Sequence, residues 1–191
     1  MAKPDGRKLR FRHRTRRSPV GSSPGTLIAD PSAESTRLTL TLISADKHRT
    51  IENAGIGEVV KNLDRWPLLW LDCTGLADIA MIEEIGQTFG LHPLALEDVV
   101  NVGQRPKVDF YDDNAFVVLS MIDDAVTLRY EQVAVFFGEK FVVTFQERAG
   151  DPFDPVRKRI ESSISNRLRT RGADYLAYAL IDAIVDSYFP P

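Results

Sequence analysis

The chain has 191 residues, 43% of them hydrophobic and 27% charged, which is typical of a globular domain large enough for one hydrophobic core. Its single cysteine, Cys73, excludes an intrachain disulfide, and its place in an apolar run predicts a buried, reduced thiol in a cytosolic setting. No stretch approaches the roughly 18 consecutive apolar residues of a membrane span, and the basic start is unlike a signal peptide.

Positive charge is concentrated at the start of the chain. Within the first 17 residues, eight Lys and Arg side chains accompany one Asp, a net charge of +7, whereas the whole chain carries −3. Such an arm can bind an anionic membrane or nucleic acid, but we interpret it as a disordered, solvated tail. The Pro-, Gly- and Ser-rich segment 18–26 predicts a joint. We therefore predict a basic arm and linker over residues 1–24 and one folded domain over residues 25–191.

The first part of the predicted domain alternates strands and helices. Residues 37–44 alternate apolar and polar side chains, as a strand with one face on the core does. A short helix is expected over residues 56–63, and the apolar run WPLLWLDC predicts an interior strand. Apolar residues at helical spacing predict a helix over residues 78–89 with Gly90 as its stop. A second helix is expected to start at Pro93 and to end before Gly103.

The second part predicts more strands, followed by helices. The segments NAFVVLSMI and YEQVAVFFGEKFVVTFQE indicate strands, with a tight turn at residues 138–140. Asp154 is expected to cap a helix that has Pro155 at its first position and continues to Arg171. A last helix is predicted over residues 173–189. Strands bracketed by helices indicate an α/β/α sandwich, in which helices flank a central mixed parallel and antiparallel sheet.

Two adjacent carboxylates, Glu97 and Asp98, interrupt the apolar helical segment LHPLALEDVV. Successive side chains of a helix point about 100° apart, so one acid can bind within its own subunit while the other reaches a neighbour. Carboxylates suit hard cations such as Mg²⁺ or Ca²⁺. The alternative is that the two acids form the solvated edge of a docked helix.

A second acidic pair, Asp182 and Asp186, stands four residues apart on one face of the last predicted helix. Buried acids on so apolar a helix cost free energy unless they meet a cation, a donor or water. The alternative is an amphipathic helix whose solvated edge carries both acids.

Other chemistry finds little support in the sequence. There is no glycine-rich phosphate loop, nucleophile elbow or Cys/His nucleophile pattern, so we expect no enzymatic activity. The three histidines lack metal-site spacing, and His92 is interpreted as structural. Basic residues between Arg157 and Arg171 are interpreted as a solvated helix face, and no nucleic acid is expected as a partner. Arg105 and Lys107 are expected to pair with acids near the end of the sheet.

The ordered run HPLALEDVVNVGQRPKVDFYDD, followed by FVVLSM, EQVAVFFGEKFVVTFQE, DPFDPVRKRI and GADYLAYALIDAIVDSYF, resembles the N-terminal cytoplasmic domain of CorA-type magnesium and cobalt transporters. The resemblance covers about residues 25 to 189. It implies a divalent-cation site at Asp98 shared with the next subunit, with Glu97 as its companion. It also implies that Asp182 lies near the Glu of the LED motif in a cation site, and it gives Asp186 no role.

The resemblance implies a function as well as a site. The region would be the cytoplasmic, divalent-cation-sensing part of a homopentameric channel in the cell's inner membrane, with Mg²⁺, and also Co²⁺, as regulatory ligand and transported ion. The stalk helix, the two membrane spans and the Gly-Met-Asn signature of the family are missing from the sequence, so we expect a chain truncated before them. The alternatives are a zinc-transporting relative and a stand-alone soluble regulatory domain that binds a partner.

Overall fold

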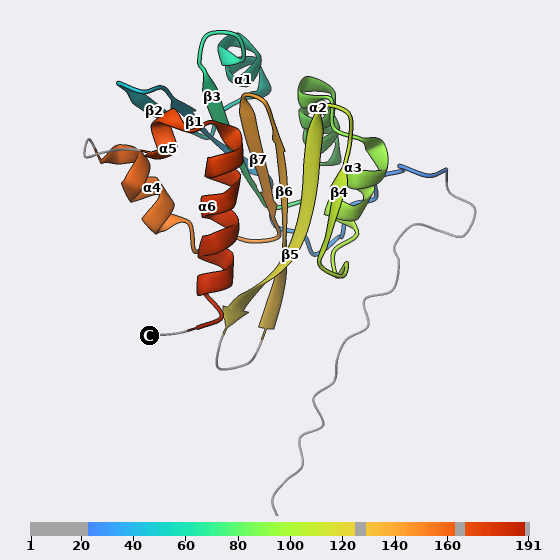
Figure 1. Cartoon of the computed structure of the whole chain (residues 1–191). Helices are drawn as coiled ribbons and strands as arrows, with labels where there is room; N and C mark the ends of the chain where they lie inside the picture. The colour runs from blue at the N-terminus through green and yellow to red at the C-terminus, as the bar shows by residue number, and fades with distance from the viewer. Residues whose placement is uncertain (1–22, 125–128, 163–166, 190–191) are drawn as a thin grey trace, which may run out of the picture.

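In a computed structural model, residues 23–124, 129–162 and 167–189 are described, and within them seven strands form one sheet (Figure 1). The strand order is β2-β1-β3-β7-β6-β5-β4, and of these neighbours β3 and β7 run parallel while the others run antiparallel. The strands are β1 Arg37–Ile43, β2 His48–Glu52, β3 Leu68–Thr74, β4 Lys107–Phe110, β5 Asn114–Asp124, β6 Arg129–Gly138 and β7 Phe141–Gln146.

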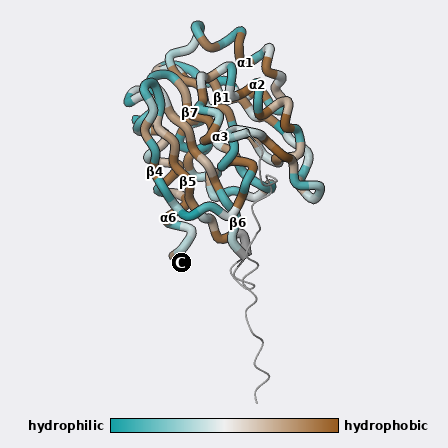
Figure 2. Tube along the Cα trace, turned by 90° about the vertical axis from the view of Figure 1, so that its right-hand side faces the viewer, coloured by the Kyte–Doolittle hydropathy of each residue, from teal (hydrophilic) through white to brown (hydrophobic). Residues whose placement is uncertain are grey.

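Helices cover both faces of this sheet. On one face lie α1 Ile56–Asn62, α2 Ile79–Phe89 and α3 Pro93–Val100, and on the other lie α4 Asp154–Glu161, α5 Arg167–Thr170 and α6 Ala173–Asp186. Each face has its own hydrophobic core, because successive strand residues point to opposite sides. Leu71 packs on the α1–α3 side and its neighbour Trp70 on the α4–α6 side. Figure 2 shows hydrophobic positions along β5 and β7. The predicted α/β/α sandwich with a mixed sheet is confirmed.

Local signals explain how α2 and α3 are placed. The Asp78 side chain caps α2 by accepting from the Met81 N–H at 3.0 Å, and Gly90 ends the helix with a left-handed φ of 64°. His92 then caps α3, where its Nδ1 accepts from the Leu94 N–H at 3.2 Å, as its structural interpretation predicts. The two helices cross closely, since a side chain at Gly86 would collide with Leu96.

The structure differs from the sequence expectations at the edges of the sheet. Strands β2 and β4 were not predicted. β2 has no apolar alternation, and β4 alternates over only four residues, whose apolar side chains Val108 and Phe110 are exposed. The expectation that His48 lies in a turn is wrong, because His48 begins β2. The expected cap at Asp154 is wrong, because α4 already begins at that residue and Phe153 occupies the cap position. The long helix expected up to Arg171 is divided into α4 and α5, with residues 163–166 outside the described part.

Other expectations are confirmed or lie outside the described residues. Cys73 is fully buried, and the turn between β6 and β7 falls at the predicted place. The basic residues 1–22 are not among those the structure describes. Across residues 23–124, 129–162 and 167–189, every helix is too short or too polar to cross a bilayer.

Candidate functional site

The end of helix α3, which carries both acids of the LED segment, is hydrogen-bonded to strand β6 through one side chain. Gln132 on β6 donates from Nε2 to the Asp98 carbonyl oxygen at 2.8 Å. Its Oε1 accepts from the Gly103 and Gln104 N–H groups at 3.0 and 2.9 Å. Gln132 therefore satisfies backbone groups at the end of the helix and in the loop that follows, which sets the orientation of Asp98.

The first acid of the pair, Glu97, points inward. Its residue is 7% exposed, and its Oε2 accepts from the Gly25 N–H at 2.8 Å. Its Oε1 accepts from Asn101 Nδ2 at 3.4 Å. Within this chain Glu97 therefore joins α3 to the segment that enters the domain, 72 residues earlier.

The second acid, Asp98, lies at the surface and is paired. Its side chain is 27% exposed, and its Oδ2 lies 2.7 Å from Lys107 Nζ. The same ammonium lies 2.6 Å from Asp109 Oδ2, so one cation bridges two carboxylates. The expected pairing of Lys107 with acids near the end of the sheet is confirmed. The ammonium occupies the position at which a small cation would bridge these two side chains.

The third predicted ligand, Asp182, is exposed on α6, on the opposite face of the sheet from α3. The structure therefore does not bring Asp182 together with Glu97 or Asp98 within one copy. Asp186 is also exposed, so in the single chain α6 is an amphipathic helix whose solvated edge carries both acids. In the part of the chain that the structure describes, no three His, Cys, Asp or Glu side chains are grouped so that they can hold a metal ion. A site built on these acids needs ligands from another copy.

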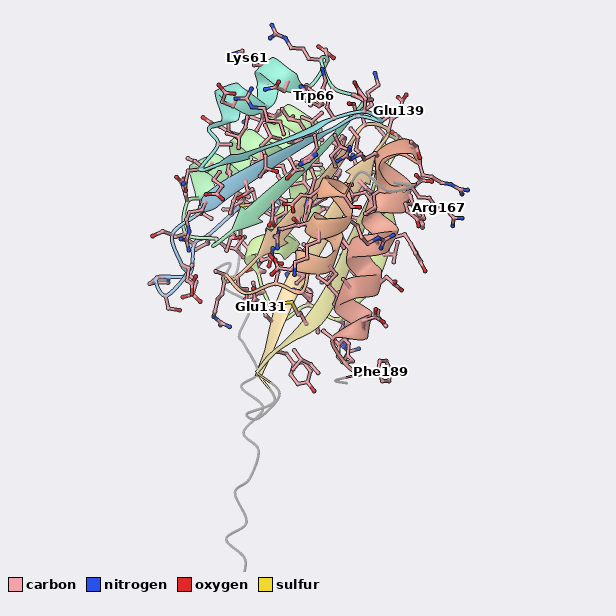
Figure 3. The ribbon with its side chains drawn as sticks, turned by 90° about the vertical axis from the view of Figure 1, so that its left-hand side faces the viewer. Lys61, Trp66, Glu131, Glu139, Arg167 and Phe189 are labelled. Atoms are coloured by element: carbon pink, nitrogen blue, oxygen red, sulfur yellow. The ribbon has the colours of Figure 1, made fainter. Side chains whose placement is uncertain are left out.

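A buried ion-pair network on the α4–α6 face was not predicted. Arg157 on α4 lies 2.8 Å from Asp72 Oδ2 on β3 and 2.7 Å from Asp151 Oδ1. The Arg157 side chain is 33% exposed, so its interpretation as part of a solvated helix face is wrong. Figure 3 shows this side of the molecule, on which Arg167 projects outward. Burial and the neighbouring Asp151 raise the pKa of Asp72.

The remaining oxygen of Asp72 is held by neutral donors. Asp72 Oδ1 accepts from the Thr144 hydroxyl and from Gln146 Nε2, both at 2.7 Å. The Trp70 indole N–H donates in turn to Thr144 Oγ1 at 3.0 Å. The network borders a polar cavity of about 540 Å³ above β1 and β2. The sequence feature that could have revealed this network is Asp72 inside the apolar run LLWLDC, because a buried acid needs a hydrogen-bonding or charged partner.

The family follows from comparison with known proteins. A model of the family described as CorA-like Mg²⁺ transporter protein matches residues 67–191. The chain belongs to this family. A protein of Thermotoga maritima named cobalt/magnesium transport protein CorA is 38% identical over 173 residues, which cover 88% of this chain and 49% of that protein. The putative metal ion transporter YfjQ of Bacillus subtilis is 34% identical over 155 residues, covering 80% of this chain and 46% of that protein.

Solved structures show the same fold at low sequence identity. The complete CorA magnesium transporter of Methanocaldococcus jannaschii superimposes with a TM-score of 0.59 at 13% identity, over 79% of this chain and 45% of that one. The ZntB cytoplasmic domain of Vibrio parahaemolyticus gives a TM-score of 0.55 at 10% identity, over 81% of this chain and 61% of that one. This chain spans about half the length of these two curated relatives, at 49% and 46%.

Proposed function

We propose that this chain is the cytoplasmic, divalent-cation-sensing part of a CorA-like metal transporter of the cell's inner membrane. Membership of the family supports the role in metal transport, and Mg²⁺ and Co²⁺ are the proposed cargo because the Thermotoga relative is named for both. The observation that carries the sensing role is the surface position of Asp98, where one lysine ammonium already bridges two carboxylates.

The residues of one copy do not fit a complete Mg²⁺ site. Glu97 binds a backbone N–H group, Asp98 is neutralised by Lys107, and Asp182 lies across the sheet. Asp98 and Asp182 are nevertheless reachable from outside, so they are the acids that a neighbouring copy can approach in the proposed homopentamer. Glu97 would support such a site by fixing α3.

The proposed switch is electrostatic. Acids that meet where copies touch repel each other when no cation is present, and a divalent cation between them favours the joined, symmetric arrangement. Five equivalent sites that each contribute about 1.4 kcal/mol of preference sum to about 7 kcal/mol, which inverts a two-state population. Weak sites therefore suffice. Because Mg²⁺ releases its water reluctantly, contacts through water satisfy the same geometry.

Calorimetric titration with MgCl₂, at chain concentrations at which copies associate, tests whether Asp98 binds the cation. Lys107→Met removes the competing ammonium, and we expect Mg²⁺ to bind this variant about tenfold more tightly than the original chain. Asp98→Asn should abolish the binding heat. The exposed Lys140 offers a matched control, because Lys140→Met removes the same charge in the turn between β6 and β7, outside the Lys107–Asp98 ion pair, and should leave the affinity unchanged.

Two outcomes contradict the sensing role: a binding heat that is the same in the original chain and in Asp98→Asn, and the absence of binding from all variants. A parallel titration with ZnCl₂ tests the alternative of a zinc-transporting relative. The ZntB cytoplasmic domain has the same fold as this chain. A preference for Zn²⁺ over Mg²⁺ at Asp98 would favour that relative.

A further inference from the structure

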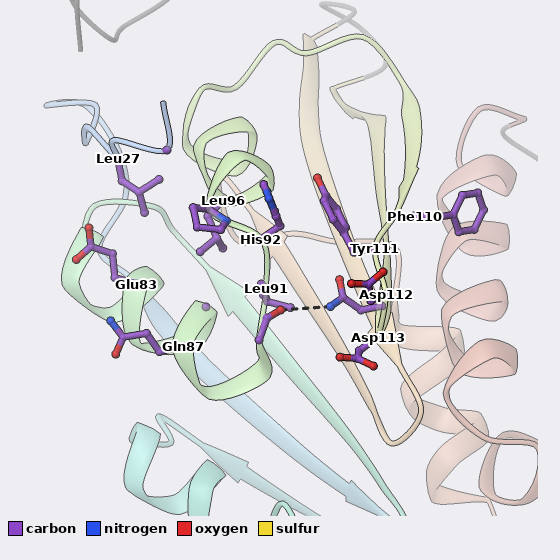
Figure 4. A pocket seen from close by; sticks show the side chains of 15 residues that line it. Leu27, Glu83, Gln87, Leu91, His92, Leu96, Phe110, Tyr111, Asp112 and Asp113 are labelled. Atoms are coloured by element: carbon purple, nitrogen blue, oxygen red, sulfur yellow. Dashed lines mark hydrogen bonds between the residues drawn. The ribbon is translucent and has the colours of Figure 1, made fainter. Parts of the chain in front are cut away.

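An acidic pocket of about 700 Å³ lies beside the proposed sensing helix, between α2, the start of α3 and the turn from β4 to β5. In Figure 4, Glu83 lies on one side of this pocket, and Asp112 and Asp113 lie on the other. All three carboxylates are exposed, and no Lys or Arg is among the described residues that line the pocket. The pocket therefore attracts positive charge.

A buried amide in the lining needs a hydrogen-bond donor. Asn114 is 8% exposed, and its Nδ2 donates to the Gly90 carbonyl oxygen at 3.4 Å. Its Oδ1 is buried and has no partner among the described residues. Rotating the amide would bring Oδ1 against the Gly90 oxygen, so the present orientation is favoured. None of the donors of the described lining, such as the Gln87 amide, His92 Nε2–H or the Tyr111 hydroxyl, is hydrogen-bonded to Oδ1, so a donor group that enters the pocket would satisfy it.

The pocket also presents a flat aromatic surface. The rings of His92 and Tyr111 are stacked, with centroids 4.8 Å apart and an interplanar angle of 13°. Because His92 Nδ1 accepts from a backbone N–H group, the proton of its neutral ring is on Nε2. A planar cation with several N–H donors fits this combination of flat rings, carboxylates and an unpartnered oxygen. The guanidinium group of arginine has that chemistry.

The basic arm of this chain enters the domain at the edge of the same pocket. Gly25 lines the pocket, and its N–H group is bound to Glu97 Oε2. The arm has six arginines and two lysines within residues 3–17, and the nearest, Arg17, is eight residues before Gly25. Eight residues reach up to about 26 Å, several times the width of roughly 9 Å that such a volume implies. The linker between them is rich in Gly, Pro and Ser, which permits a reversal of direction.

We propose that the acidic pocket is a docking site for an arginine of the N-terminal arm of the same chain. The guanidinium pairs with Asp112 and Asp113, lies against the His92–Tyr111 ring pair and supplies the donor that Asn114 Oδ1 lacks. The arm is then held against α2 and α3 instead of being a solvated tail. Loss of these contacts at high salt follows from the exposure of the carboxylates.

Paramagnetic broadening in the full chain tests the docking. Cys73 is fully buried, so Thr15→Cys provides the accessible thiol for a nitroxide label between two arm arginines. We expect the backbone amides of residues 111–114 to be broadened at least about fivefold more than in a chain that also carries Asp112→Asn and Asp113→Asn. A matched control combines Asp64→Asn with Glu139→Gln, which removes the same charge from exposed acids outside the pocket and should keep the broadening.

Several results would overturn the proposal. Equal broadening in the labelled chain and its Asp112→Asn, Asp113→Asn variant would show that the pocket does not hold the arm. Broadening of the same size in an isotope-enriched, unlabelled chain mixed with a nitroxide-labelled chain would assign the arm to a second copy. Equal broadening together with loss of the arm signals on adding phosphatidylserine vesicles would assign the arm to a membrane surface. Unchanged amide shifts in β3 and β7 verify that each variant is folded.

Discussion

The backbone N–H of Gly25 donates a hydrogen bond to Glu97 Oε2 over 2.8 Å, although 72 residues separate the two. A carboxylate in the middle of an apolar helix therefore has a structural task, which is to fasten the entry of the domain to α3. The bond is partly buried, so its loss leaves a backbone donor without a partner.

Glu97→Ala should destabilise the fold by about 1–3 kcal/mol, because the Gly25 N–H group and the Asn101 amide lose their acceptor. Urea denaturation monitored by tryptophan fluorescence measures the change. Glu84→Ala on α2 is the control, since Glu84 is exposed and its loss should change stability by less than about 0.5 kcal/mol. Equal effects of the two substitutions would remove the structural role of Glu97.

Arg157→Ala should destabilise the domain by about 2–3 kcal/mol, because it leaves Asp72 and Asp151 close together without a cation. This estimate is below the range for fully buried pairs, since a third of the Arg157 side chain is exposed. Arg157→Lys should recover only part of the loss, because a lysine ammonium cannot reproduce the forked contacts to both acids. Denaturation of both variants beside Lys158→Ala, an exposed residue of the same helix, provides the measurement. A Lys158→Ala effect as large as that of Arg157→Ala would contradict the role of the network.

Asp72 should make the stability fall as the pH rises. The carboxyl has a pKa near 3.8 when unfolded and a higher pKa when folded, chiefly because it is buried. Between these two pKa values the folded chain binds more protons than the unfolded chain, so the free energy of unfolding decreases with pH through that window. In Asp72→Asn this contribution is absent, and its stability relative to the original chain should rise as the pH increases from about 4 to 7. The measurement is the urea midpoint of each chain across this pH range, and the slope of the difference between Asp72→Asn and the original chain is compared with that of the exposed control Asp64→Asn. A constant difference between Asp72→Asn and the original chain would contradict the raised pKa.

Strong periodic patterns made much of the fold predictable. The alternation of leucine and threonine in β1, the unbroken apolar run of β3 and the turn before β7 follow directly from how sheets bury one or both faces. Strand β2 was missed because this exposed edge strand carries no apolar pattern, and β4 was missed because its alternation covers only four residues. The break between α4 and α5 was also missed, since the apolar spacing is continuous across it.

The candidate site was predictable only as a set of residues. The sequence identified Glu97 and Asp98 as unusual, but their different roles depend on Gly25 and Lys107, which approach from other parts of the chain. The pairing of Asp72 with Arg157 spans 85 residues, and nothing local in the sequence links the two. Asn114 likewise becomes notable only when the fold buries its amide beside three exposed acids.

The parallel pairing of β3 with β7 has a consequence for how the protein is made. The hydrogen bond from Trp70 on β3 to Thr144 on β7 joins residues 74 positions apart. The other sheet neighbour of β7, which is β6, is also synthesised after β3. At about 5–20 residues per second, the ribosome takes roughly 4 to 15 s to deliver the partner of β3. Throughout that interval the nascent chain exposes one edge of an almost wholly apolar strand, which is the kind of segment that a holding chaperone shields.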